Sequence, residues 1–489
     1  MTGLALGAGV RVEHDLLGDK EVPADAYYGI HTQRALENFP VSGVPIAHLR
    51  ELVVAMAAVK EAAALANRDL GLLDAERAGA IVAACREIRE GGLRDQFVVD
   101  IIQGGAGTST NMNANEVICN RALEILGHPR GDYARLHPLD HVNMSQSTND
   151  VYPTAAKVAA HMAIEDLLDA MAELEDAFRD KADELADVLC VGRTQLQDAV
   201  PMTLGQEFRA YAVMIDEDRR RLAEARALIR EINLGGTAVG TGLNAPPGYR
   251  ELARAHLAAV TGIAVETAPD LVEATQDAGV FVQLSGVLKR IAVKLSKTCN
   301  DLRLLSSGPR AGFGDINLPP VQAGSSIMPG KVNPVIPEMV TQVAFEVIGN
   351  DVTITLAAEA GQLQLNAFEP VIVSRLFNSL RRLRAANRLL AERCVRGITA
   401  NRDHLDAMVR HSIGLATALN PVIGYAAATR LAAEALRTGR SVADLALESG
   451  LVGADQLAVV LSPDHLVGRP DPPPEPTAER PALPSGAPD

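Results

Sequence analysis

The stretch "PTAAKVAAHMAIEDLLDAMAELEDAFRDKADELADVLC", residues 153–190, decides the fold class. After its first residue it contains neither proline nor glycine, the two residues that most often interrupt a helix. Its larger apolar side chains are spaced by 4, 3, 4 and 7 residues, the heptad spacing of a helix that buries one stripe: Leu167, Met171, Leu174, Phe178 and Leu185. We therefore expect one long helix that packs against others along its length.

Similar long patterns recur along the chain, at 204–232, 270–306, 336–359 and 369–397. Five helices of this length predict a mainly all-α protein built around a long helical bundle. Shorter helical patterns precede the bundle at 49–67, 74–90 and 113–126, and others follow it at 402–410, 422–437 and 441–461.

These patterns divide the chain into four regions. Residues 1–147 form a mixed, mostly helical N-terminal domain, in which "EVPADAYYG" (21–29) is expected to be a loop. Residues 148–400 form the central long helical bundle, and residues 401–466 form a small C-terminal helical domain. Residues 467–489 are rich in proline and have almost nothing to bury, so we expect a disordered tail.

Composition restricts the core and the partners. Hydrophobic residues make up 47% of the chain but aromatic residues only 3%, and tryptophan is absent. The core must therefore consist of Ala, Leu, Val and Ile, which suits close-packed helices. A formal net charge of −15 argues against nucleic acid or an anionic membrane as a partner. An anionic substrate would have to be held by local hydrogen-bond donors.

The cysteines indicate a reducing compartment. They are scattered, odd in number and without a CxxC pair: Cys85, Cys119, Cys190, Cys299 and Cys394. We expect reduced thiols in a cytoplasmic protein, with neither a disulfide framework nor a zinc site. The N-terminus lacks the basic start and the apolar run of a signal peptide. No stretch approaches the roughly 20 apolar residues of a membrane span.

Four clusters rich in hydroxyl and amide side chains stand out. They are "QGGAGTSTNMNANE" (103–116), "HVNMSQSTNDVYPTA" (141–155), "GRTQLQDAVPMTLGQEF" (192–208) and "GSSIMPGKVNPVIPE" (324–338). Helix capping explains any one of them, because Ser, Thr and Asn are good N-caps. A cap needs only one or two side chains, however, and each cluster carries several. Without a cysteine nucleophile or a carboxylate pair, the four together predict a site that binds and stabilises an anion.

Two of the clusters contain recognisable helix starts. Asn333 is a good N-cap and Pro334 suits the first helical position, so the following helix would offer free N–H groups to a carboxylate beside Lys331. Glycines on either side allow this loop to bend and close: Gly324 and Gly330. In the third cluster, Thr203 and Gln206 fit a capping box.

The length of the first long helix has a consequence for assembly. Cluster 141–150 precedes Pro153, which we expect to open that helix, and cluster 192–197 lies just past its end. About 38 residues at ~1.5 Å per residue separate those ends by about 57 Å if the helix is straight. If both clusters serve one site, that site must form between subunits, and the protein is an obligate oligomer.

With these residues in view, the chain resembles the aspartase/fumarase superfamily along nearly its whole length, to about residue 466. "GSSIMPGKVNP" is similar to the signature of the superfamily, and its glycine-lysine-valine version is similar to the aspartase and fumarase branch. The resemblance implies three mostly helical domains in a homotetramer, with the central bundles forming a twenty-helix core. It also implies active sites built from three subunits.

Within that branch, three segments resemble aspartases more than fumarases: "YYGIHTQRALENF" (27–39), "GAGTSTNMNANEV" (105–117) and "HVNMSQSTND" (141–150). Gln195 stands where many members of the superfamily have a histidine that takes part in proton transfer. Because glutamine is neither an acid nor a base at neutral pH, this residue weakens the fumarase reading.

The resemblance implies the reversible elimination of ammonia from L-aspartate to give fumarate, without a metal or an organic cofactor. Ser325 matches the catalytic base of the family. The matching substrate-binding positions are Thr108, Ser147, Thr148, Asn149, Thr194, Gln195, Ser326, Lys331 and Asn333. Three alternatives stay open at this point. They are a fumarase acting on L-malate, a lyase acting on a substituted aspartate, and an inactive helical oligomer with a structural or binding role.

Overall fold

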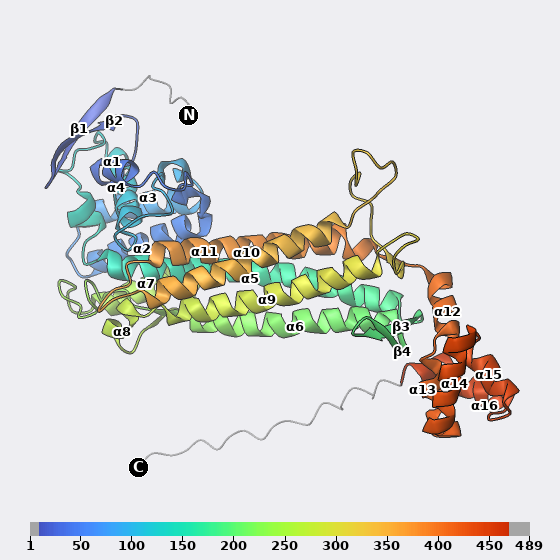
Figure 1. Ribbon diagram of the computed structural model, residues 1–489. Coiled ribbons are helices and arrows are strands. Elements are labelled where there is room, and N and C mark those ends of the chain that lie inside the picture. Colours follow the sequence, from blue (N-terminus) through green and yellow to red (C-terminus); the bar gives the residue numbers. More distant parts are fainter. Residues whose placement is uncertain (1–8, 469–489) are drawn as a thin grey trace, which may run out of the picture. The chain divides into compact units, whose positions relative to one another are not determined.

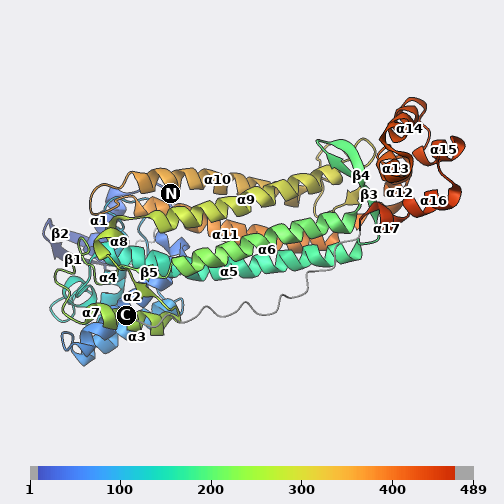
Figure 2. The same ribbon diagram turned by 90° about the horizontal axis from the view of Figure 1, so that it is seen from below.

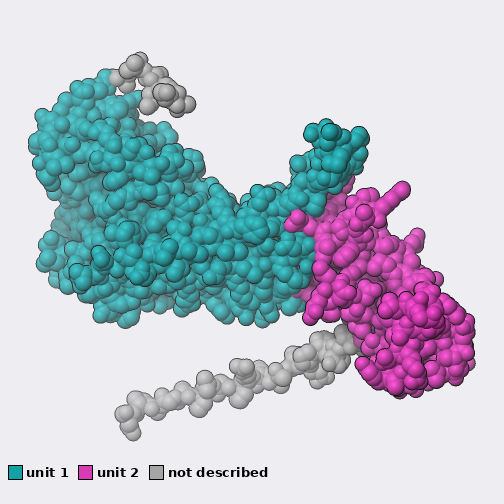
Figure 3. Space-filling model, viewed as in Figure 1, with its two compact units in different colours: residues 1–176, 213–302, 321–394 teal, residues 177–212, 303–320, 395–489 magenta. Residues whose placement is uncertain are grey.

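The computed structural model describes residues 9–468, which form a mainly helical protein (Figure 1). The chain divides into two compact units, shown in Figure 3. Unit 1 comprises residues 1–176, 213–302 and 321–394, and unit 2 comprises residues 177–212, 303–320 and 395–489. The predicted mainly all-α fold is confirmed, whereas the predicted boundaries of three domains stay a prediction.

The N-terminal part of unit 1 is a layer of helices with one small hairpin. Strands β1 (Val10–Asp15) and β2 (Gly18–Pro23) pair antiparallel. The helices that follow are α1 (Ile30–Asn38), α2 (Arg50–Asp69), α3 (Ala75–Arg89) and α4 (Thr108–Ile125). The pattern 113–126 therefore predicted α4 but missed its first turn. The expected loop 21–29 was partly wrong, because its first residues lie in β2.

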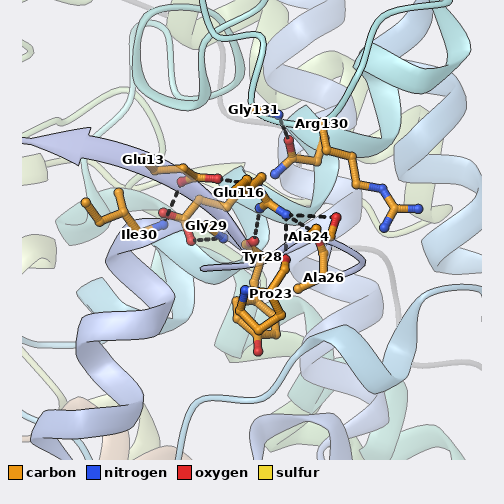
Figure 4. A network of polar contacts seen from close by, with 12 residues as sticks. Glu13, Pro23, Ala24, Ala26, Tyr28, Gly29, Ile30, Glu116, Arg130 and Gly131 are labelled. Carbon is orange, nitrogen blue, oxygen red and sulfur yellow. Dashed lines mark hydrogen bonds and ion pairs between the residues drawn. The ribbon is translucent and has the colours of Figure 1, made fainter. Parts of the chain in front are cut away.

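Two buried carboxylates join the hairpin to α1 and α4 (Figure 4). Glu116 of α4 accepts a hydrogen bond from the backbone N–H of Gly29 at 2.8 Å. It also accepts from the N–H groups of His31 (2.8 Å) and Thr32 (3.1 Å). Glu13 of β1 accepts one from the N–H of Ile30 at 2.8 Å. The first N–H groups of a helix have no partner within the helix, so these carboxylates cap α1 from a distance. Burial raises the pKa of Glu116 to about 7.

Five long helices form the bundle, as predicted, and lie side by side in Figures 1 and 2. They are α5 (Thr148–Glu184), α6 (Leu204–Leu228), α9 (Gly279–Leu305), α10 (Val335–Glu359) and α11 (Glu369–Arg393). Four of the heptad side chains lie in α5 and are fully buried: Leu167, Met171, Leu174 and Phe178. The fifth, Leu185, follows the last residue of α5 and is 2% exposed. The stripe that the sequence predicted is therefore the buried face of α5.

The predicted helix 270–306 is two helices. Helix α8 (Leu271–Gln276) ends at Asp277, which has an extended backbone, and α9 begins two residues later. The link between α6 and α8 holds a short parallel pair, β5 (Glu231–Ile232) with β6 (Glu266–Thr267), and α7 (Tyr249–Thr261).

Unit 2 contains a hairpin and a small helical cluster. Strands β3 (Leu189–Thr194) and β4 (Gln197–Thr203) form the hairpin, and β7 (Ile316–Asn317) pairs with β8 (Thr399–Ala400). The helices are α12 (Arg402–His411), α13 (Leu415–Ile423), α14 (Tyr425–Thr438), α15 (Val442–Glu448), α16 (Ala454–Val460) and α17 (Pro463–Leu466).

The structure also bears on the expectations about membrane spans, cysteines and the C-terminal tail. From residue 9 to residue 468, no helix is both long enough and apolar enough to span a membrane. All five cysteines are buried, and none of them forms a disulfide. The tail predicted for residues 467–489 lies outside the described residues from position 469 onward.

Candidate active site

The first polar cluster shapes the start of α4. Three successive residues before it have left-handed backbones, with φ of 84° at Gly105, 52° at Ala106 and 87° at Gly107. A side chain at Gly107 would meet the buried ring of Tyr152 at 2.5 Å, so only glycine fits both the backbone angle and the space. This turn leaves Thr108 exposed at the first position of α4, with its hydroxyl 2.7 Å from the carbonyl oxygen of Gly105.

The second cluster forms the start of α5. The hydroxyl oxygen of Ser147 accepts from the N–H of Asn149 at 3.3 Å, and the hydroxyl oxygen of Thr148 accepts from the amide of Asn111 at 3.0 Å. Asn111 belongs to α4, so this bond ties the starts of the two helices together. We call Thr108 with residues 147–149 the hydroxyl cluster. The structure thus places four of the residues predicted from the sequence at the linked starts of α4 and α5.

Helix α5 begins at Thr148, so the expectation that Pro153 opens it was wrong. A proline inside a helix lacks the N–H that would bond to the carbonyl oxygen four residues earlier, here that of Asn149. The side-chain amide of Asn233 donates to that oxygen at 3.0 Å instead. A contact from a distant part of the sequence therefore allows the helix to start one turn before its proline.

Asp150 and a glycine-rich segment complete this end of α5, and sequence reasoning gave them no role in the site. The fully buried carboxylate of Asp150 accepts from the N–H groups of Ser147 (2.9 Å), Gly235 (2.9 Å) and Thr237 (3.0 Å). Asn149 donates to the carbonyl oxygen of Ala238 at 2.7 Å. Burial raises the pKa of Asp150 to about 6. The glycines of 235–242 were the available signal, but they indicated only a turn between helices.

A buried lysine lies behind the hydroxyl cluster and was also missed. Lys60 of α2 has no exposed surface, and its ammonium donates to the side-chain oxygens of Asn143 (2.9 Å) and Gln146 (3.0 Å). Burial lowers the pKa of Lys60 to about 7. Its position within the alanine-rich run of α2 carried no indication that it faces polar side chains.

The third cluster, residues 192–208, begins in a hairpin and reaches a helix only at Leu204. Thr194 and Gln195 lie at the exposed tip of the β3–β4 hairpin in unit 2. Gln195 and Leu196 both have left-handed backbones, with φ of 56° and 61°, as in a tight hairpin turn. The predicted capping box is confirmed, because Thr203 and Gln206 exchange hydrogen bonds of 2.9 and 3.0 Å.

The fourth cluster is a loop before α10, which we call the serine loop (residues 324–333). The hydroxyl oxygen of Ser325 accepts from two backbone N–H groups, those of Ile327 (3.1 Å) and Met328 (2.8 Å). The ends of the loop are joined by a bond of 2.8 Å from the N–H of Gly324 to the carbonyl oxygen of Lys331. Ser325 therefore lies where backbone dipoles favour negative charge on its oxygen.

The other members of the serine loop differ partly from expectation. Asn333 is not the N-cap, because α10 begins at Val335 and Pro334 occupies the cap position. The amide of Asn333 instead donates to the carbonyl oxygen of Gly324 at 2.7 Å and closes the loop. Ser326 and Lys331 are exposed. The apolar side chain of Ile327 is 83% exposed.

One chain does not bring the hydroxyl cluster and the serine loop together. Both belong to unit 1, but α4 and the start of α5 lie at one end of the bundle and the chain before α10 lies at the other (Figures 1 and 2). The 25 residues of α10 run between those ends, a length of about 37 Å at ~1.5 Å per residue. A site that contains both must draw them from different subunits.

Family models and relatives match almost the whole chain. A lyase family model matches residues 18–349, and a model of the fumarase C C-terminus matches residues 415–468. An aspartate ammonia-lyase of Pseudomonas aeruginosa is 59% identical over 94% of this chain and 97% of its own length. Aspartate ammonia-lyases of Helicobacter pylori and Escherichia coli are 55% and 53% identical, again over 94% of this chain, and over 98% and 96% of their own lengths.

Solved structures agree with this match. A fumarate lyase (delta crystallin) of Brucella melitensis, solved with bound cobalt, has a TM-score of 0.90 and 57% identity, and the match covers 92% of this chain and 98% of that one. A class II fumarase of Schistosoma mansoni has a TM-score of 0.88 and 35% identity, with 93% and 98% covered. Three of its sequence relatives are the aspartate ammonia-lyases named above, and the chain therefore belongs to the aspartase/fumarase superfamily of lyases.

Proposed function

We propose that this protein catalyses the reversible elimination of ammonia from L-aspartate to give fumarate. The names of its relatives support the reaction, and the observation that carries it is the environment of Ser325. A serine hydroxyl is a poor base until it is ionised, and two N–H groups point at its oxygen. Such preorganised donors stabilise an alkoxide in the same way that an oxyanion hole stabilises an intermediate.

In the proposed mechanism, Ser325 removes a proton from Cβ of the substrate. The charge that develops there spreads into the adjacent carboxylate, which becomes an aci-carboxylate with two negative charges. Hydroxyl donors that bind this dianion better than the ground-state carboxylate lower the barrier. We assign that role to Thr108, Ser147, Thr148 and Ser326. The carbon–nitrogen bond then breaks, and the electron pair leaves with the amino group as ammonia.

The remaining assignments concern the other end of the substrate. Lys331 and Asn333 hold the α-carboxylate in our proposal, and Asn149, Thr194 and Gln195 lie near the amino group or that carboxylate. Because the substrate's own carboxylate accepts the charge, the mechanism assigns no metal or organic cofactor.

We also propose that the enzyme works as a homotetramer with sites shared between subunits. The separation of the hydroxyl cluster from the serine loop supports sharing. An apolar stripe on α10 supports assembly, because Phe345, Val352 and Leu356 are 62%, 57% and 63% exposed and are spaced by seven and four residues. A second copy of the chain would bury this stripe. Five bundle helices from each of four subunits would give the twenty-helix core. Five buried cysteines without a disulfide favour a cytoplasmic location.

A substrate assay tests the reaction. The purified protein is incubated separately with L-aspartate and L-malate, and the ultraviolet absorbance of fumarate is followed. We expect fumarate from L-aspartate. Activity with L-malate alone would instead identify a fumarase, which the neutral side chain of Gln195 disfavours. Turnover of a substituted aspartate alone would identify a related lyase, and no turnover of any of these would favour an oligomer with a structural or binding role.

A further inference from the structure

The buried lysine behind the hydroxyl cluster determines how its neighbouring amides are oriented. The ammonium of Lys60 can donate hydrogen bonds but cannot accept them. Its two partners, Asn143 and Gln146, must therefore turn their carbonyl oxygens toward it, at the observed 2.9 and 3.0 Å. Burial lowers the pKa of Lys60 to about 7, but the neutral amine keeps two N–H groups for these two acceptors.

The orientation of Asn143 fixes the next residues in turn. Asn111 and Asn115 of α4 both reach the same side-chain oxygen of Asn143, each at 3.2 Å and each through its NH₂ group. The side-chain oxygens of Asn111 and Asn115 are then buried without a hydrogen-bond partner. Leaving a buried oxygen unpaired is unfavourable, so these two amides are not in the orientation that suits them best. Their orientation follows from that of Asn143.

The last step reaches the hydroxyl cluster. The second N–H of Asn111 donates to the hydroxyl oxygen of Thr148 at 3.0 Å. That hydroxyl group already accepts a hydrogen bond from the protein, so its own hydrogen is free to be donated to another acceptor. We propose that Lys60 is a positioning residue, an inference that rests on the proposed function. Through Asn143 and Asn111, it directs the hydroxyl hydrogen of Thr148 toward the substrate carboxylate.

A double-mutant cycle on the full-length enzyme tests this role. Thr148→Val, Lys60→Met and the double variant are compared for kcat/KM with L-aspartate. We expect Thr148→Val to lose about 10²–10³-fold and Lys60→Met about 10–10²-fold. If Lys60 acts through Thr148, the double variant falls no more than about threefold below Thr148→Val alone. Losses that multiply would overturn the inference, as would a Thr148→Val variant with full activity.

Two further variants separate this role from a general loss of stability. Lys157→Met is the matched control, because Lys157 is also buried, at 6% exposed, and donates to the backbone oxygen of Glu231 at 2.8 Å. We expect its activity per assembled enzyme to stay within about threefold of the wild type. Asn111→Leu leaves Lys60 intact and removes the link, so it should also be non-additive with Thr148→Val. It decides the question if Lys60→Met does not assemble.

The outcomes also distinguish this inference from the proposed function. A wild-type protein that does not convert L-aspartate overturns both. An active wild-type protein whose Lys60 and Thr148 losses multiply overturns only the role of Lys60.

Discussion

The hydroxyl cluster is held in place by the core of the protein, whereas the serine loop is held mainly by its own backbone. Thr148 and Asn149 bond to α4 and to the glycine segment 235–242. Within residues 9–468, the hydroxyl oxygen of Ser325 accepts only from the N–H groups two and three residues away. In the proposed mechanism, this difference separates two tasks: one region keeps its hydroxyl donors in a fixed arrangement, and the other closes over the bound substrate without disturbing the core.

The largest expected effect comes from the serine loop. Ser325→Ala should lower kcat by more than about 10³-fold, because no other group in the loop can replace the base. Ser326→Ala is the neighbouring control, and as the loss of one donor it should cost about 10²-fold. Steady-state assays with L-aspartate and a measurement of oligomer size check both variants. Equal losses in two fully assembled variants would remove the distinction between base and donor.

Substitutions at two glycines with similar backbone angles test how far the two regions differ in the free energy of unfolding that a change costs. Gly107 and Gly330 have φ of 87° and 75°, but an added side chain would meet Tyr152 at 2.5 Å in the first and nothing within 4 Å in the second. We expect Gly107→Ala to cost roughly 2–5 kcal/mol, from backbone strain plus overpacking. Gly330→Ala should cost about 1 kcal/mol from strain alone.

Thermal unfolding of these two variants provides the measurement. The comparison predicts a much lower midpoint for Gly107→Ala than for Gly330→Ala. Equal midpoints would mean that the start of α4 relaxes as easily as the serine loop, which would contradict the fixed arrangement of the hydroxyl cluster.

A smaller effect depends on pH and on one buried carboxyl group of unit 1. Glu369 is buried at the start of α11, one of its oxygens has no hydrogen-bond partner, and burial raises its pKa to about 8. Because the folded state holds this proton more tightly than the unfolded state, the contribution to stability is full below about pH 4.5 and is lost as the pH rises through about 8. Glu369→Gln should therefore unfold about 2–4 °C above the wild type near pH 9, with a smaller gap near pH 5.

The exposed Glu90 provides the control for this pH effect. Glu90→Gln should leave the difference in midpoint from the wild type nearly constant between pH 5 and pH 9. If Glu369→Gln behaved in the same way, the carboxyl group of Glu369 would be ionised in the folded protein without cost, and the interior behind α5 would be less apolar than its burial indicates.

The sequence predicted those parts of the molecule that repeat or follow local rules. The heptads of α5 and the capping box at Thr203 depend only on near neighbours, and both were predicted correctly. The start of α5 was missed because the amide of Asn233 replaces the N–H that Pro153 lacks. The hairpin tip at Gln195 was missed because neither Gln nor Leu is typical of a tight turn.

Only some of the residues at the candidate site were predicted, again because the sequence shows local patterns but not contacts between distant residues. Residues that match the superfamily, such as Ser325 and Thr148, were named from the motifs. Lys60 and Asp150 were not named, because their roles arise from burial beside side chains that are distant in the sequence. A lysine within a run of alanines has the same sequence appearance whether it faces water or an amide.

The central claim is that the hydroxyl cluster of one subunit and the serine loop of another form one site. Two inactive variants, Thr148→Val and Ser325→Ala, are purified, mixed in equal amounts, dissociated and reassembled, and then assayed with L-aspartate. If the two regions come from different subunits, random assembly leaves both intact in about a quarter of the sites, so about a quarter of wild-type activity should return. If the mixture stays as inactive as its components while the tetramer re-forms, each site takes both regions from one chain, and the claim is wrong.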